Sequence, residues 1–215
     1  MSARVIAIDG PAGSGKSTVA RALAARLGLG YLDTGAMYRA VTFAAMELGL
    51  ELTDAGVTGE LARNLTLEMG PASVVVNGID ATAAIRGAAV SGAVSVVAAH
   101  PPVREELRRR QRAWVASHGG GVVEGRDIGT VVFPDAQLKV YLTASPDVRA
   151  HRRAAEQGET DEATIATWAS NLAERDHLDS TRADSPLREA DGATVVDTSD
   201  RTIDEVVDDI VGRLP

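Results

Sequence analysis

The sequence predicts an α/β fold in which a parallel five-stranded sheet is flanked by helices. Short apolar runs rich in β-branched residues alternate with longer stretches of helical spacing, a pattern typical of parallel sheets covered on both faces. The first apolar run also ends in a glycine-rich loop that leads directly into a helical stretch. With 215 residues, of which 45% are hydrophobic and 24% charged, we expect one domain, residues 1–215, with a sizeable core.

The first strand, loop and helix follow one another directly. Residues 5–8 form a short apolar strand that stops at Asp9 and Gly10. Apolar positions then recur at helical spacing from Lys16 to Leu27, and Gly28 is the expected C-terminal cap. Because Asp9 ends the strand, we expect its carboxylate to position either the loop or a metal ion.

The rest of the chain continues the alternation with one interruption. Further strands are expected at residues 30–33, 121–125, 137–142 and 194–197. Helices are expected at residues 36–48, 103–115 and 203–214. A β-hairpin at residues 65–69 and 73–78 interrupts the pattern, so residues ~60–95 are interpreted as an insertion.

Composition excludes several classes of protein. The chain has no cysteine, which excludes a disulfide framework and a thiolate metal site and fits a cytoplasmic protein. The formal net charge of -8 disfavours a nucleic-acid partner. No apolar run reaches the roughly 18 residues of a transmembrane helix, so we expect no membrane partner.

A phosphate-binding loop is the strongest motif. Gly10, Gly15, Lys16 and Ser17 meet the pattern G-x-x-x-x-G-K-[ST] between a strand and a helix. Backbone N–H groups of such a loop surround phosphate oxygens, Lys16 reaches the β and γ phosphates, and the Ser17 hydroxyl ligates Mg²⁺. The predicted nucleoside triphosphate site is Gly10, Pro11, Ala12, Gly13, Ser14, Gly15, Lys16, Ser17 and Thr18.

This loop does not by itself specify the reaction. The Asn-Lys-x-Asp motif of GTPases is absent, because neither Lys16 nor Lys139 follows an asparagine. Small size, an arginine-rich helix and the insertion favour a small-molecule or nucleotide kinase. A nucleotide-dependent switch without catalysis is the alternative from another class, and the intact Lys16, Ser17 and arginine set argue against it.

Four further segments point to one kinase family. They are residues 32–39 (LDTGAMYR), 102–104 (PVR), 124–134 (EGRDIGTVVFP) and 174–182, which begins Glu174-Arg175-Asp176 and ends at Arg182. Through them the chain resembles bacterial cytidylate kinases nearly end to end. The resemblance implies a P-loop kinase fold with a monophosphate-binding insertion at about 35–105 and a short lid at about 150–180. It implies phosphorylation of CMP and dCMP with ATP and Mg²⁺, and argues against adenylate, uridylate or shikimate kinase.

The same resemblance assigns roles to single residues. Ser95, Arg104 and Asp127 match the base-reading positions, where Asp127 accepts from the cytosine amine and Arg104 donates to N3 or O2. Uracil would instead turn a carbonyl towards Asp127. The other acceptor residues match family positions with four roles. These positions hold the acceptor phosphate (Arg39, Arg126), lie near the ribose (Arg175, Asp179), lie near the phosphates (Arg182) or line the acceptor pocket (Thr34, Tyr38). Lys16, Arg126 and Arg182 are the expected catalytic residues.

Some assignments leave alternatives open. Ser95 stands among alanines and valines and is also consistent with a plain helix or turn hydroxyl. Three arginines of the helix at 103–115 are expected to be solvated: Arg108, Arg109 and Arg112. The polar stretch at residues 156–161 is interpreted as a mobile lid. Three arginines precede it, Arg149, Arg152 and Arg153, and the sequence leaves open whether they contact phosphates or form an exposed helix face. We expect a monomer.

Overall fold

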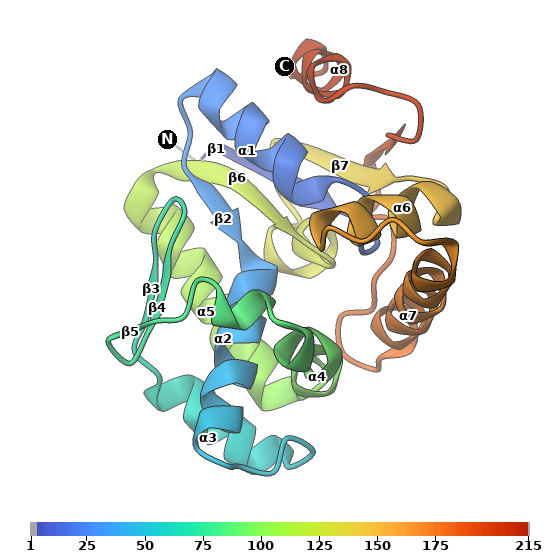
Figure 1. The fold of residues 1–215 in the computed structure, drawn as a ribbon. Coiled ribbons are helices and arrows are strands. Elements are labelled where there is room, and N and C mark those ends of the chain that lie inside the picture. The colour runs from blue at the N-terminus through green and yellow to red at the C-terminus, as the bar shows by residue number, and fades with distance from the viewer. Residues whose placement is uncertain (1–3, 215) are drawn as a thin grey trace.

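The computed structural model describes residues 4–214, and in them a five-stranded parallel sheet has the strand order β2-β6-β1-β7-β8 (Figure 1). The predicted α/β class and parallel sheet are therefore confirmed. The strands are β1 (Arg4–Asp9), β2 (Tyr31–Asp33), β6 (Gly120–Gly125), β7 (Leu138–Thr143) and β8 (Thr194–Asp197). None of the helices in residues 4–214 is long and apolar enough to cross a membrane.

Helices cover both faces of this sheet. They are α1 (Lys16–Leu27), α2 (Thr34–Glu47), α5 (Pro101–His118) and α8 (Ile203–Gly212). Successive side chains of β1 point to opposite faces. Ile6 and Ile8 pack in one core with α1 and α8, and Val5 and Ala7 pack in the other with α2 and α5. Burial on both faces explains why β1 is a continuous apolar run.

A smaller piece follows α2 and lies beside the main sheet (Figure 1). It consists of α3 (Ala55–Asn64), β3 (Leu67–Met69), β4 (Val74–Val76), β5 (Ile79–Asp80), η1 (Ala84–Arg86) and α4 (Ala88–Ala98). The predicted hairpin is confirmed by the antiparallel pairing of β3 with β4, and β5 pairs with β4 as a third antiparallel strand that the sequence did not predict. Asn77 and Gly78 both have positive φ, 50° and 79°, which allows a two-residue turn between β4 and β5.

Two helices and a turn occupy the region between β7 and β8. They are α6 (Pro146–Glu156) and α7 (Glu162–Thr181), which lie side by side (Figure 1). Residues 156–161, interpreted as a lid, form the end of α6 and its connection to α7. Asp161 caps α7 by accepting from the Thr164 N–H. Gly28 caps α1 in the left-handed conformation, as predicted.

Candidate functional site

The loop between β1 and α1 is closely packed against the sheet. Gly10 has a φ of 150°, and a Cβ on it would lie 2.0 Å from the carbonyl oxygen of Leu142 in β7. Gly15 has a φ of 84° and begins α1. A side chain on Gly10 would therefore clash with β7, and the left-handed φ of Gly15 favours glycine there. The Lys16 Nζ donates to the Pro11 carbonyl at 2.6 Å inside the curve of this loop.

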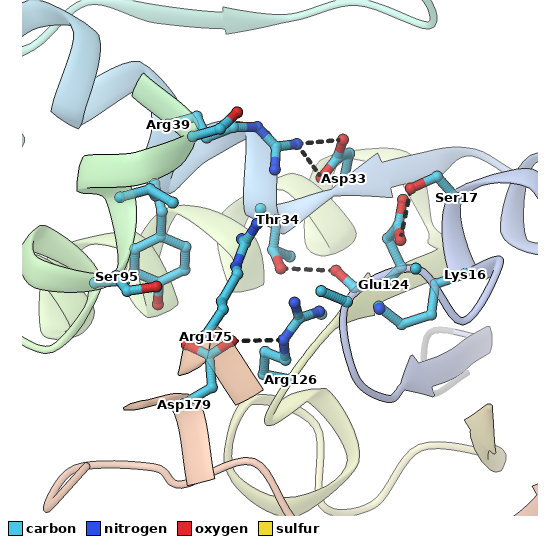
Figure 2. Close-up of a pocket in the computed structure, with 18 of the residues that line it drawn as sticks. Lys16, Ser17, Asp33, Thr34, Arg39, Ser95, Glu124, Arg126, Arg175 and Asp179 are labelled. Carbon is cyan, nitrogen blue, oxygen red and sulfur yellow. Dashed lines mark hydrogen bonds and ion pairs between the residues drawn. The ribbon is translucent and has the colours of Figure 1, made fainter. Parts of the chain in front are cut away.

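A cleft of about 480 Å³ extends from the loop to α4 and α7. In the view of Figure 2, Lys16 and Ser17 lie at one end and Ser95 at the other, with Arg126 and Arg175 between them. Every residue predicted to face the acceptor lines this cleft: Thr34, Tyr38, Arg39, Ser95, Arg104, Arg126, Asp127, Arg175, Asp179 and Arg182.

The predicted triphosphate residues divide into two groups. Six line the cleft: Ala12, Gly13, Gly15, Lys16, Ser17 and Thr18. Gly10, Pro11 and Ser14 do not line it and instead shape the loop, for example through the 3.0 Å bond from the Ser14 hydroxyl to the Pro11 carbonyl. The structure therefore gives these three residues a supporting position.

Arg104 and Asp127 form the most deeply buried ion pair that lines the cleft. Their Nη2 and Oδ2 atoms are 2.6 Å apart, and the two side chains are 1% and 6% exposed. The same guanidinium donates to the Ala98 carbonyl at 3.1 Å and lies over the Tyr38 ring. Burial alone would lower the pKa of Arg104, but Tyr38 and Asp127 raise it above its ordinary value. Arg104 therefore remains charged.

A second group of charges joins α7 to β6. Arg126 donates to Asp179 at 2.9 Å, and the Arg182 guanidinium lies 3.6 Å from both Asp179 and Asp127. Arg175 lies close by, and burial followed by repulsion from Arg126 lowers its pKa to about 10. Several guanidinium groups with fewer carboxylates around them favour the binding of an anion.

Asp33 anchors a pair of arginines at the side of the cleft. It caps α2 by accepting from the Ala36 N–H at 2.8 Å and pairs with Arg39 at 3.1 Å. Arg86 of η1 also pairs with it, at 3.2 Å, and lines the cleft. Sequence reasoning missed Arg86, because only the fold brings η1 against the end of β2.

Glu124, at the end of β6, is the second functional residue that sequence reasoning missed. It accepts from the Ser17 hydroxyl at 3.0 Å and from the Tyr31 hydroxyl. Burial, then the nearby Asp33, raises the pKa of Glu124, while Lys16 opposes the change. Burial, followed by Arg126, lowers the pKa of Lys16 to about 7. A signal was present, since Glu124 is the next-to-last residue of β6 and directly precedes the Gly-Arg-Asp segment.

Comparison with known proteins identifies the family. The cytidylate kinase family pattern matches residues 6–215. The chain belongs to the cytidylate kinase family. It is 49% identical over 220 residues to a cytidylate kinase of Rhodococcus opacus (strain B4), covering 99% of this chain and 93% of that protein.

Other relatives are longer, and the solved structures are more distant. A bifunctional pantoate ligase/cytidylate kinase of Parasynechococcus marenigrum (strain WH8102) is 51% identical over 96% of this chain. The chain spans 42% of that relative's length. A gluconokinase structure from Sinorhizobium meliloti 1021 matches 99% of this chain and 92% of its own, with 17% identity and a TM-score of 0.52. At that identity the match supports the shared fold.

In this member of the cytidylate kinase family, Asp9 positions the segment that carries Asp127. Its two carboxylate oxygens accept from the N–H groups of Ile128 and Gly129 at 2.8 and 2.7 Å. These residues begin η2 (Ile128–Val132), a short π-helical turn directly after Asp127. Burial raises the pKa of Asp9 to about 6, although both backbone bonds oppose it. Asp9 therefore orients the chain after β6.

The arginines outside the acceptor set are more constrained than expected. Arg109 is 67% exposed, as predicted, but the prediction for Arg108 was wrong, because it pairs with Asp184 at 2.8 Å. Arg112 donates to the carbonyls of Val131 and Val132, so it is not simply solvated. Of the three arginines on α6, Arg153 lines the cleft, and Arg149 and Arg152 bond to other protein groups.

Proposed function

We propose that this chain transfers the γ-phosphoryl group of ATP to CMP and dCMP, giving ADP and the cytidine diphosphates. Membership of the cytidylate kinase family and the phosphate loop support a nucleotide kinase. The observation that carries the choice of acceptor is the buried pair of Arg104 and Asp127, which lies in the same cleft as Lys16.

That pair matches the polar edge of cytosine. Asp127 supplies an acceptor for the exocyclic amine, and Arg104 and Ser95 supply donors for N3 and O2. Uracil has a carbonyl in place of the amine, so its oxygen would face the carboxylate. A buried mismatch of this kind costs about 1–3 kcal/mol, enough to favour CMP over UMP by roughly 5- to 150-fold.

The residues beside the loop fit a magnesium ion. Mg²⁺ prefers oxygen ligands and is usually held by one or two carboxylates together with substrate phosphates. The Ser17 hydroxyl and the Glu124 carboxylate supply such oxygens side by side, 3.0 Å apart. Among residues 4–214, no group of three or more acidic or histidine side chains forms a complete cage. Mg²⁺, when bound here, would neutralise charge on the donor phosphates.

The transfer needs no general base in this proposal. The attacking atom is a phosphate oxygen of the acceptor, which is already anionic near neutral pH. Catalysis then consists of positioning and charge stabilisation. Lys16, Arg126 and Arg182 would neutralise charge on the transferring group, Arg39 and Arg86 would hold the acceptor phosphate, and Arg175 and Asp179 would contact the ribose.

Two segments would cover the bound nucleotides. We assign monophosphate binding to residues 35–105, which contribute Arg39, Ser95 and Arg104, and a lid to residues 150–180. Closure of both would exclude water and limit hydrolysis of ATP. We further propose that the enzyme is a monomer. We also propose that it is cytoplasmic, since the chain has no cysteine to suggest an oxidising compartment.

An ADP-release assay across AMP, CMP, dCMP, UMP and shikimate tests this function. We expect rapid ADP formation with CMP and dCMP, slower formation with UMP, and only background with AMP and shikimate. Equal rates with UMP or AMP would contradict the base-reading assignment. Background rates with all five compounds would contradict the kinase activity.

A further inference from the structure

Ala12 of the phosphate loop is held on both of its backbone polar groups by side chains from outside the cleft. Its N–H donates to the Asp176 carboxylate of α7 at 3.1 Å, and its carbonyl accepts from Arg149 of α6 at 3.1 Å. Asp176 and Arg149 also form an ion pair with each other. We call these three residues the Ala12 clamp.

The clamp is shielded and tightly packed. The Arg149 and Asp176 side chains are 11% and 19% exposed. A Cβ on Gly13, the next residue of the loop, would lie 3.1 Å from the Cβ of Arg149, so α6 rests directly on the loop. Neither Arg149 nor Asp176 lines the cleft, whereas Ala12 and Gly13 do. The clamp therefore contacts the donor loop through side chains that lie outside the cleft.

A carboxylate at this position requires an explanation. A phosphate loop attracts anions through its N–H groups, so a negative charge on the same backbone opposes ATP electrostatically. Arg149 offsets that charge. Asp176 is therefore poorly placed as a simple aid to ATP binding, and its position on α7 indicates another role.

Helix α7 connects the clamp to the acceptor side. Arg175, the residue before Asp176, lines the cleft. Asp179, one turn after it, holds Arg126 at 2.9 Å. One continuous helix therefore contacts the donor loop through Asp176 and the acceptor end through Arg175 and Asp179. A shift of Ala12 upon phosphate binding would move these groups with it.

We propose that Asp176, together with Arg149, is a positioning residue that couples the two substrate sites, so that each nucleotide strengthens binding of the other. This inference rests on the proposed function, because it takes ATP and CMP as the two ligands. Coupling between sites is reciprocal and typically amounts to about 5- to 150-fold in affinity. A purely structural role for Asp176 would change stability but leave this factor intact.

Isothermal titration of CMP with and without a non-hydrolysable ATP analogue and Mg²⁺ measures the coupling factor. We expect CMP to bind at least about fivefold more tightly with the analogue in the unmodified protein. In Asp176→Ala the factor should fall close to one. Asp176→Asn keeps an oxygen for the Ala12 N–H but weakens the ion pair, so its factor should be intermediate.

Two further variants make the test specific. Glu174→Ala changes an exposed carboxylate on the same helix, for which the described residues provide no hydrogen-bond or ion-pair partner, and should keep the full factor. Arg149→Met should lose coupling, and combining it with Asp176→Ala should add little, because the two residues act as a unit. If Asp176→Ala does not fold, Asp176→Asn and Arg149→Met carry the same test.

The outcomes separate this inference from the proposed function. Full coupling in Asp176→Ala, or in both Asp176→Asn and Arg149→Met, would overturn the inference, as would independent binding in the unmodified protein. CMP turnover by the unmodified protein is measured on the same samples. Failure of that turnover would contradict the proposed function instead.

Discussion

The guanidinium of Arg104 and the carboxylate of Asp127 form a buried ion pair, with Nη2 and Oδ2 2.6 Å apart. The two residues come from α5 and from the end of β6, 23 positions apart in the chain. In the proposed function a cytosine ring inserts against both groups. The proposal therefore gives this pair two roles, in the stability of the fold and in the choice of base, and the two effects can be measured separately.

Asp127→Asn should narrow the preference for CMP over UMP by roughly fivefold or more, because an amide can donate to the uracil carbonyl as well as accept. The measurement is the ratio of kcat/KM for the two nucleotides. Asp184→Asn is the matched control, since Asp184 lies 3.9 Å from Arg104 but does not line the cleft. A ratio that Asp127→Asn leaves unchanged would rule out base reading by this residue.

Arg104→Met should lower the free energy of unfolding by roughly 3–5 kcal/mol, because it leaves the Asp127 carboxylate buried without its closest partner. Urea denaturation checks this value. Arg109→Met on the same helix removes a side chain that is 67% exposed and should change stability by less than about 0.5 kcal/mol. Similar losses in both variants would mean that the ion pair is not the cause.

Asp9→Asn should change how stability depends on pH. The folded-state pKa of Asp9 is raised to about 6 from 3.8, so the native state holds this proton more tightly than the unfolded chain. The carboxyl contributes stability below about pH 4 and loses it as the pH rises through about 6. The difference in unfolding free energy, wild type minus Asp9→Asn, should therefore fall by about 2 kcal/mol between pH 4 and pH 7.

Chemical denaturation at several pH values measures that difference. Asp208→Asn is the control, because its side chain is 63% exposed and it should give a nearly constant difference. A constant difference for Asp9→Asn as well would show that Asp9 titrates in the folded protein as it does in water.

Lys16→Ala should reduce kcat by roughly 100-fold or more while CMP still binds, since Lys16 lies at the loop end of the cleft and CMP is assigned to the other end. Steady-state assays and CMP titration give the two readouts. Lys139→Ala changes the other lysine of the chain and should keep near-normal turnover. Near-normal kcat in Lys16→Ala would contradict the role of the loop.

The sequence predicts best where one short segment determines the structure. The strand, loop and helix from Val5 to Leu27 follow from local periodicity and from glycines that fit one backbone shape. Helix α4 was missed because it consists of alanines and valines with one glycine, and its only polar side chains, Ser91 and Ser95, are too few to reveal a helical period. The third strand, β5, was missed because it has only two residues.

Contacts between distant segments account for the features of the site that the sequence did not predict. Ser17 and Glu124 are 107 positions apart, and Asp33 and Arg86 are 53 apart. No local pattern links them, since the pairings arise only when β6 lies beside β1 and η1 lies against the end of β2. Family resemblance predicted which residues face the acceptor, whereas the contacts of Asp9, Arg86 and Asp176 became visible only in the fold.

A single-turnover reaction with ATP labelled in its γ-phosphate and an excess of enzyme over ATP tests the central claim most directly. With CMP present, we expect the label to appear in CDP at the same rate and in the same amount as ADP. Without CMP, ADP should form only slowly. Formation of ADP without labelled CDP would contradict the claim that this cleft holds donor and acceptor together for phosphoryl transfer.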